Sequence, residues 1–105
     1  MTKYDLEKLF YDLLKKKNID KEISYTSTLL INKNVLAKKI GEETIEVILE
    51  YLGNNKDKII QESADLLYHL IVMWISSNVN PSEVWQELQK RKGISGFEEK
   101  KSRTN

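Results

Sequence analysis

Apolar residues recur along this chain at intervals of three and four, which is the spacing of one face of an α-helix. The first such stripe predicts a helix from about Lys3 to Lys17, with Thr2 as its N-cap. Its apolar members are Leu6, Leu9, Phe10, Leu13 and Leu14. A polar connection, NIDKEISYTS, follows this helix, and a short turn is expected over Leu29 to Ile31.

Two longer stripes predict a helical hairpin in the middle of the chain. Its arms run from about Lys33 to Leu52 and from about Lys56 to Ser77. The sequence GNN separates them: Gly53 suits the left-handed position after a helix, and Asn55 suits an N-cap. The sequence NVNP ends the second arm, and Pro81 is expected to begin a last helix that reaches about Lys92.

Residues that break helices are scarce. The chain of 105 residues contains one Pro and four Gly, and its Val, Ile and Thr do not gather in alternating runs. These features predict an all-α fold, a bundle of four to five helices built around the hairpin. One domain is expected over residues 1–93, followed by a charged C-terminal tail over residues 94–105.

The charge balance and the composition exclude several classes of function. There are 17 basic and 16 acidic residues, so a net charge of +1 gives no general attraction to nucleic acid or to an anionic membrane. No apolar run approaches the ~18 residues of a membrane span, and the N-terminus lacks the apolar segment of a signal peptide. The absence of Cys excludes thiolate metal ligands and fits a cytoplasmic protein.

Acidic residues lie at helical spacing within both arms of the predicted hairpin. One face of the first arm carries Glu43, Glu46 and Glu50. One face of the second arm carries Glu62, Asp65 and His69. A tight turn that pivots at Asn54 would set Glu46 opposite Glu62, Glu43 opposite Asp65, and Lys39 opposite His69.

Carboxylates that face one another across a hairpin call for a cation. Packed helix axes lie ~8–10 Å apart, so side chains of both arms can reach one ion. Without that ion, like charges raise the carboxyl pKa values and destabilise the fold. The predicted ligands are Glu43, Glu46, Glu62 and Asp65. Oxygen ligands alone favour Mg²⁺ or Mn²⁺, with Ca²⁺ as a further option.

A solvated acidic face is the alternative interpretation of these carboxylates. It accounts well for Glu42 and Glu50, because charged residues on helices usually face water. It is less favoured for Asp65, since apolar residues surround Asp65 on the helical wheel and predict a buried position. A hydrogen bond from one helix to another is a further option for a buried Asp.

Five stretches in this order resemble the all-α nucleoside triphosphate pyrophosphatase superfamily, which includes MazG-like proteins. They are SYT (24–26), KKIGEETIE (38–46), ESADLLYHLIV (62–72), WQELQKR ending at Arg91, and SGFEEKKSR (95–103). Within that superfamily the chain resembles the phosphoribosyl-ATP pyrophosphatases of histidine biosynthesis. That family usually has a glycine between SYT and the lysine pair; here Asn32 or Asn34 is expected to take the left-handed conformation instead.

The resemblance implies hydrolysis of phosphoribosyl-ATP to phosphoribosyl-AMP and pyrophosphate, the second step of histidine biosynthesis. This chemistry needs charge neutralised on the leaving pyrophosphate and a positioned water, which agrees with a carboxylate-bound Mg²⁺. One of the predicted ligands, or Glu42, would orient or deprotonate the water. The catalytic candidates are Glu42, Glu43 and Glu46.

Seven residues are candidates for binding the nucleotide substrate. Ser24, Tyr25 and Thr26 are candidates through the resemblance alone. Lys38 and Lys39 precede the acidic cluster by one turn, from which they can reach phosphates. The remaining candidates are His69 and Arg91. Their alternatives are a hydrogen-bonded core histidine for His69, a helix C-terminal charge for Arg91 and a solvated basic turn for the lysines.

A homodimer is expected, with the second arm of the hairpin at its interface, because Ile71, Val72, Trp74 and Ile75 almost encircle that helix. The resemblance implies the same. A MazG-like or dUTPase-like nucleotide pyrophosphatase is the alternative enzyme, and SYT and SGFEEK argue against it. The second alternative is a non-enzymatic helical dimerisation module whose carboxylates are solvated.

Overall fold

The computed structural model describes residues 5–18 and 24–92 of the chain. Within these residues it contains five α-helices, one short 3-10 helix and no strand, so the predicted all-α fold is confirmed. The elements are α1 (Leu6–Leu14), η1 (Lys15–Asn18), α2 (Tyr25–Ile31), α3 (Lys33–Leu52), α4 (Lys56–Ser76) and α5 (Pro81–Lys90). The predicted tail, residues 94–105, lies outside the described residues.

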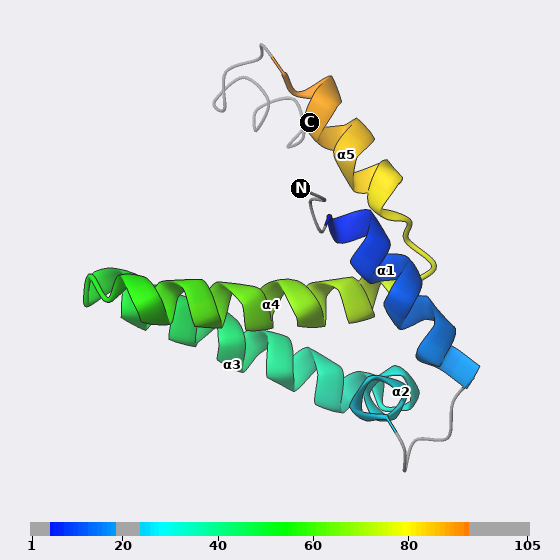
Figure 1. The fold of residues 1–105 in the computed structure, drawn as a ribbon, viewed down its shortest axis with the longest axis horizontal. Coiled ribbons are helices and arrows are strands. Elements are labelled where there is room, and N and C mark those ends of the chain that lie inside the picture. The colour runs from blue at the N-terminus through cyan, green and yellow to red at the C-terminus, as the bar shows by residue number, and fades with distance from the viewer. Residues whose placement is uncertain (1–4, 19–23, 93–105) are drawn as a thin grey trace, which may run out of the picture.

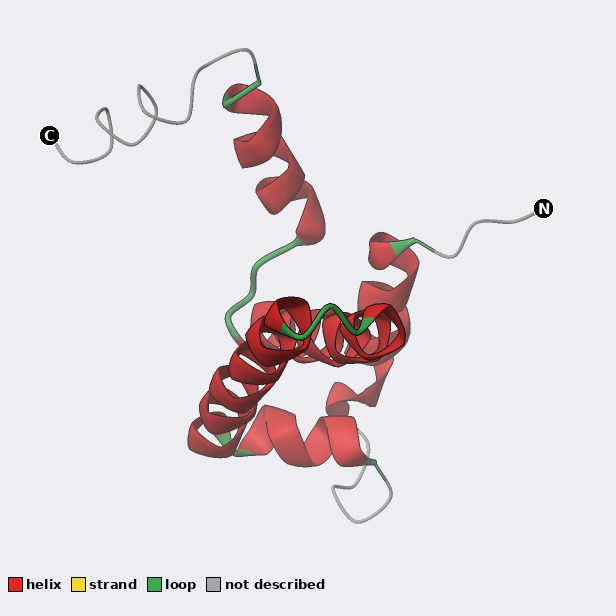
Figure 2. Cartoon of the chain, turned by 90° about the vertical axis from the view of Figure 1, so that its left-hand side faces the viewer, coloured by secondary structure: helices red, strands yellow, loops and turns green. Residues whose placement is uncertain are grey.

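Helices α3 and α4 form the predicted antiparallel hairpin, which is the longest feature of the molecule (Figure 1). Helix α1 crosses α4 near one end of the hairpin, and α2 packs against both arms at the same end. Helix α5 leads away from the hairpin and contacts α1. Viewed toward the hairpin loop, the two arms project away from the other helices (Figure 2).

Side-chain caps set the first residue of each helix. Asn55 accepts a hydrogen bond from the Lys58 N–H, as predicted for the start of α4. Pro81 occupies the first turn of α5 as predicted. The prediction of Thr2 as the first N-cap was wrong, because Asp5 caps α1 through a 2.7 Å hydrogen bond from the Lys8 N–H.

The expected polar linker is in part a helix. Ser24 adopts an extended conformation and its Oγ accepts from the Ser27 N–H, so the SYTS sequence begins α2 instead of continuing a loop. Leu29 is fully buried, which gives this short helix an anchor in the core. Asn32 then ends α2 and caps α3 at φ −113°, so neither Asn32 nor Asn34 takes the expected left-handed conformation.

The hairpin turn uses a different residue from the one predicted. Gly53 has φ −81° and closes the last turn of α3, whereas Asn54 has φ 57° and occupies the left-handed position. Asn tolerates this region better than most residues with a Cβ. The Asn55 N–H then bonds to the Glu50 carbonyl at 3.2 Å, which closes the turn and sets the register of the two arms.

The core lies at one end of the hairpin. Its fully packed members are Phe10, Leu13, Leu29, Leu36, Ile71, Val72 and Ile75. Ile71, Val72 and Ile75 therefore need no partner subunit for cover, contrary to the reason given for the dimer, and the dimer itself stays a prediction. Helices α1 and α2 already cover that part of α4 within one chain.

The loop-proximal half of the hairpin is where apolar side chains are uncovered. Leu49 is 60% exposed and Ile60 is 58% exposed, and further exposed side chains in this half include Ile45, Ile48, Tyr51 and Leu52. The radius of gyration is 16.0 Å, compared with about 13 Å for a compact domain of about 100 residues. No helix among the described residues combines the length and apolar character that crossing a membrane requires.

Gly41 provides a test of helix propensity in α3. A Cβ built there meets no atom of the described residues within 4 Å. Gly41→Ala is expected to raise the free energy of unfolding by about 0.5–1 kcal/mol, because Gly is a poor helix former with a large unfolded-state entropy. Equilibrium urea unfolding measures this change. Gly53→Ala is the control, because the Cβ added there would contact the Leu49 carbonyl oxygen at 3.4 Å, unlike the Cβ added at position 41. A loss of stability in Gly41→Ala would contradict the prediction.

Candidate active site

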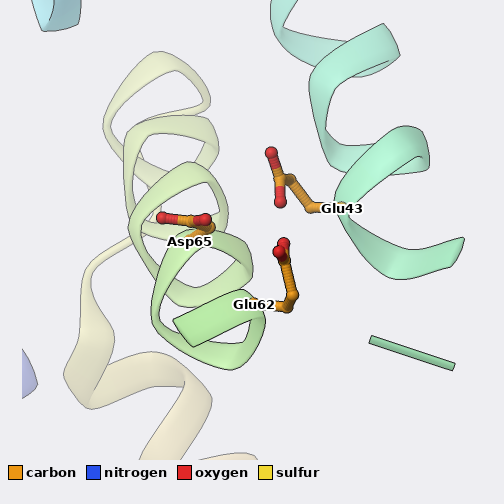
Figure 3. A group of neighbouring side chains, drawn as sticks. All are labelled: Glu43, Glu62 and Asp65. Carbon is orange, nitrogen blue, oxygen red and sulfur yellow. The ribbon is translucent and has the colours of Figure 1, made fainter. Parts of the chain in front are cut away.

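Three carboxylates meet between the two arms of the hairpin. Glu43 comes from α3, and Glu62 and Asp65 come from α4 one turn apart. Each offers an oxygen within 4.8 Å of the others, and their side chains converge on one region between the helices (Figure 3). The hairpin register expected from the position of Asn54 accounts for this meeting, since it sets Glu43 opposite Asp65.

The burial of these groups differs from residue to residue. Glu43 and Glu62 are half-buried, and each has one oxygen, Oε2, that is buried and has no hydrogen-bond partner among the described residues. Asp65 is exposed, so the prediction of a buried Asp65 was wrong. The helical wheel misled because this part of the hairpin is only two helices thick, so apolar neighbours such as Ile60 and Leu67 are themselves exposed.

Glu46, the fourth predicted ligand, lies beside the group of three. The neighbouring Glu62 raises the pKa of the Glu46 carboxyl above its ordinary value of 4.5, by hydrogen bonding to the protonated form and by like-charge repulsion. Smaller contributions come from desolvation and from the charges of Glu42 and Asp65. Glu46 is thus in electrostatic contact with the cluster, and its predicted position opposite Glu62 agrees with this contact.

The carboxylate group fits a hard divalent cation. Buried carboxylate oxygens without a donor are costly, because they have lost water and gained no hydrogen bond. A cation would bind the orphaned Oε2 atoms of Glu43 and Glu62 and offset the mutual repulsion of the cluster. An all-oxygen donor set with one exposed member suits an ion that keeps water or phosphate among its ligands, as Mg²⁺ does.

The SYT residues divide into two structural roles and one exposed side chain. Ser24 caps α2, and Thr26 is 3% exposed with its Oγ1 hydrogen-bonded to the Tyr68 hydroxyl. Tyr25 is 52% exposed, and its hydroxyl lies 3.1 Å from Nε2 of His69. Among the three predicted substrate residues, Tyr25 therefore offers the most surface to a ligand.

His69 is buried and hydrogen-bonded at both ring nitrogens. Its Nδ1 lies 2.7 Å from the Asp65 carbonyl oxygen, one turn earlier on α4, and its Nε2 faces Tyr25. The register had set Lys39 opposite His69, but the described side-chain partner of His69 comes from α2. His69 thus links the acidic turn of α4 to the SYT turn.

The predicted phosphate-binding cations lie at the edges of the site. Lys39 approaches Glu42 at 3.9 Å on the surface of α3, and Lys38 is exposed. Arg91 follows α5 and pairs with Glu87 at 3.0 Å, four residues earlier. Helix α5 leads away from the hairpin (Figures 1 and 2), and Arg91 is not a member of the carboxylate group.

Tyr68 belongs to this site, although the sequence analysis does not single it out as a site residue. It bonds Thr26, stacks near Tyr25 with ring centroids 6.2 Å apart, and lies edge-on to His69. Burial raises the pKa of its hydroxyl above the usual value of 10.0, so the group is a neutral donor or acceptor at neutral pH. The only sequence signal was its place beside His69, on the α4 face that follows Asp65.

The fold and the cluster define an all-α protein with a group of carboxylates that could hold a metal ion, and sequence comparison identifies the family within that class. The profile of the phosphoribosyl-ATP pyrophosphohydrolase family matches residues 4–92. The chain belongs to the phosphoribosyl-ATP pyrophosphohydrolase family. The family resemblance expected from the sequence motifs is thereby confirmed.

Individual relatives align over nearly the whole chain. The phosphoribosyl-ATP pyrophosphatase of Paramagnetospirillum magneticum is 43% identical over 99 residues, which are 93% of this chain and 91% of the relative. That of Gluconobacter oxydans is 40% identical over 99 residues, 93% of this chain and 74% of the relative. That of Granulibacter bethesdensis is 44% identical over 101 residues, 93% of this chain and 62% of the relative.

The raised pKa of Glu46 leads to a pH-dependent stability difference in metal-free protein. The folded state holds the Glu46 proton more tightly than the unfolded state, so this contribution to stability is present in acid and is lost as the pH rises above 4.5. Glu46→Gln removes the charge. Its melting temperature in EDTA is expected to exceed that of the wild type by an amount that grows from about pH 4 to about pH 7.

Glu50→Gln, one turn further along α3, controls for the general effect of removing one negative charge from this helix. A stability gain for Glu46→Gln that is constant with pH, or that shrinks toward neutral pH, would contradict the assigned cause.

Proposed function

We propose that this chain is a Mg²⁺-dependent phosphoribosyl-ATP pyrophosphohydrolase. It hydrolyses 1-(5-phosphoribosyl)-ATP to 1-(5-phosphoribosyl)-AMP and pyrophosphate, the second step of histidine biosynthesis, and Mn²⁺ substitutes for Mg²⁺. The observation that carries the proposal is the group of Glu43, Glu62 and Asp65, with two orphaned buried oxygens, in a chain of this family. Membership of the family supports the substrate, and the oxygen donor set supports the metal.

The reaction breaks the bond between the α-phosphorus and the oxygen that bridges to the β-phosphate, and water supplies the new oxygen. When bound, the cation neutralises charge on the substrate phosphates and on the pyrophosphate that leaves. Glu43, Glu62 and Asp65 would hold it between the two arms, and the exposure of Asp65 would leave that side open to the substrate. With the cation bound, the hairpin could accept the negatively charged phosphates of the substrate, which the carboxylates would otherwise repel.

The attacking water must lose a proton as it bonds to phosphorus. Glu42 and Glu46 are the catalytic candidates outside the group of three, and Glu43 is the candidate within it. A carboxylate beside the cluster can accept the proton or orient the water by a hydrogen bond. Lys38 and Lys39 would attract the phosphates from the adjacent turn of α3, and Ser24, Tyr25, Thr26, His69 and Arg91 complete the proposed substrate side.

The active form is proposed to be a homodimer. The exposed apolar side chains of the loop-proximal half of the hairpin support this assignment, since a monomer would leave them in water. The acidic group lies within that half, near the exposed Ile45 and Ile60, so a second subunit packed on the hairpin would approach the substrate side of the site.

Pyrophosphate release tests the activity directly. The purified chain is expected to release pyrophosphate from phosphoribosyl-ATP, and not from ATP or dUTP, only when Mg²⁺ or Mn²⁺ is present. Asp65→Asn removes an anionic ligand, so kcat/KM is expected to fall by more than about 100-fold. Asp57→Asn, in the first turn of the same helix, is the matched control and is expected to stay close to wild type.

The other outcomes separate the alternatives. Release from ATP or dUTP instead would move the protein to the MazG-like or dUTPase-like enzymes with the same metal site. No release from any of them, together with no rise in melting temperature on adding Mg²⁺, would favour the non-enzymatic dimerisation module, because a cation that binds only the folded state must stabilise it.

Light scattering after gel filtration tests the dimer. The wild type is expected to elute at twice the 12.3 kDa mass of one chain. Leu49→Lys places a charge among the uncovered apolar side chains and is expected to yield a folded monomer. Ile31→Lys, also exposed but at the end of α2, is the control. A wild-type monomer, or a Leu49→Lys dimer of unchanged affinity, would remove the proposed interface.

A further inference from the structure

Two side-chain hydrogen bonds fasten the first turn of α2 to α4. The Tyr25 hydroxyl lies 3.1 Å from Nε2 of His69, and Thr26 Oγ1 lies 2.5 Å from the Tyr68 hydroxyl. Consecutive residues of α2 thus bond consecutive residues of α4. Ser24, which caps α2, stands directly before them, so this fastening acts on the turn that begins the helix.

The hydrogen bonds between α2 and α4 are connected to the carboxylate group through the imidazole of His69. A carbonyl oxygen can only accept, so Nδ1 of His69 donates to the Asp65 carbonyl at 2.7 Å. In the neutral imidazole Nε2 then accepts the Tyr25 O–H. A continuous path therefore runs from the backbone of Asp65 through His69 to the hydroxyl of Tyr25.

The Tyr25 side chain needs contacts that hold it in place, because it is largely exposed to solvent. This side chain is 52% exposed, and its hydroxyl is hydrogen-bonded to His69. Tyr68 supports it in two ways. The Tyr68 ring lies nearly parallel to the Tyr25 ring, with 15° between their planes, and the Tyr68 hydroxyl holds the adjacent residue, the buried Thr26.

We propose that Tyr68 is a positioning residue: by holding Thr26 and flanking the ring of Tyr25, it keeps the Tyr25 hydroxyl on His69 and so fixes the SYT turn relative to Asp65. Its consequence for catalysis rests on the proposed function. The Tyr68 hydroxyl bonds Thr26, and its ring contacts Tyr25 and His69, so Tyr68 acts on the fraction of time in which the SYT turn is correctly placed.

This role predicts a change in KM with little change in kcat. If the SYT turn is correctly placed for only part of the time, apparent affinity falls by that fraction, whereas the carboxylates of α3 and α4 are unmoved. Tyr68→Phe keeps the ring and removes one hydrogen bond. The KM for phosphoribosyl-ATP is expected to rise about 3- to 10-fold, with kcat within about twofold of wild type.

The chain contains a single histidine, so the imidazole ¹⁵N resonances report His69 alone. We would record them in the full chain for the wild type, Tyr25→Phe, Tyr68→Phe and the control Tyr51→Phe, whose residue is exposed on α3. The Nε2 resonance of Tyr68→Phe is expected to move toward its position in Tyr25→Phe. Tyr51→Phe is expected to match the wild type. Should Tyr68→Phe fail to fold, Thr26→Val removes the same hydrogen bond from the side of α2.

An Nε2 resonance unchanged in Tyr68→Phe would overturn the proposal, whether or not the enzyme is active. The kinetic measurement adds a second decision. If Tyr68 acts through Tyr25, then Tyr68→Phe should not raise KM further in the Tyr25→Phe background. Independent, multiplying effects would overturn the proposal. The third outcome is that the Nε2 resonance of Tyr68→Phe moves as expected but the wild type hydrolyses no phosphoribosyl-ATP. That outcome would refute the proposed substrate and leave the positioning role supported.

Discussion

The repulsion between carboxylates that face each other across α3 and α4 is the constraint on which the site depends. Two of the three converging side chains have a buried oxygen with no donor in the part of the chain that the structure describes. A fourth side chain, Glu46, has a raised pKa because Glu62 is beside it. A helical hairpin would relieve such a conflict by sliding or splaying unless something else fixed it. The turn at Asn54, closed by the bond from the Asn55 N–H to the Glu50 carbonyl, and the packing at the opposite end of the arms provide that restraint. The cost of holding the charges together is what makes the site attractive to a cation.

The core explains why the restraint is effective. Ile71, Val72 and Ile75 of α4 are completely buried against neighbours that include Leu29 of α2 and Leu36 of α3. These contacts lie at one end of the hairpin, the turn lies at the other, and the carboxylates lie between. A one-residue slip would therefore disturb packed side chains at one end and the left-handed residue at the other. The same arrangement leaves apolar side chains exposed on the loop-proximal half, because α1 and α2 cover only the opposite end.

What could be predicted from the sequence was what local interactions determine. The bounds of α3, the cap at Asn55 and the start of α5 at Pro81 follow from periodicity and from short-range hydrogen bonds, and the structure confirms them. The pairing of acidic faces followed from one tight turn and helical geometry. The errors have non-local causes. The exposure of Asp65 depends on how many helices surround α4 at that level, and the helical state of the SYT segment depends on partners 42 and 44 residues away in the sequence. Several neighbouring residues can each cap or end a helix. Asp5, not Thr2, caps α1, and Asn54, not Gly53, takes the left-handed conformation in the turn.

The two sides of the site are built by different physical means, which bears on how substrate choice arises. The carboxylates stand on helices of 20 and 21 residues that pack along each other. Helix α2 has seven residues, too few to be stable alone, so its position depends on the bonds and ring contacts that it makes with α4. Side chains of α2 can therefore be replaced without moving the carboxylate oxygens of α3 and α4. A chain in which Tyr25, Thr26, Tyr68 and His69 were replaced together would keep an acidic hairpin and lose this substrate side. In the proposed function, the acidic hairpin supplies the metal-dependent chemistry, and the α2–α4 contact selects the nucleotide.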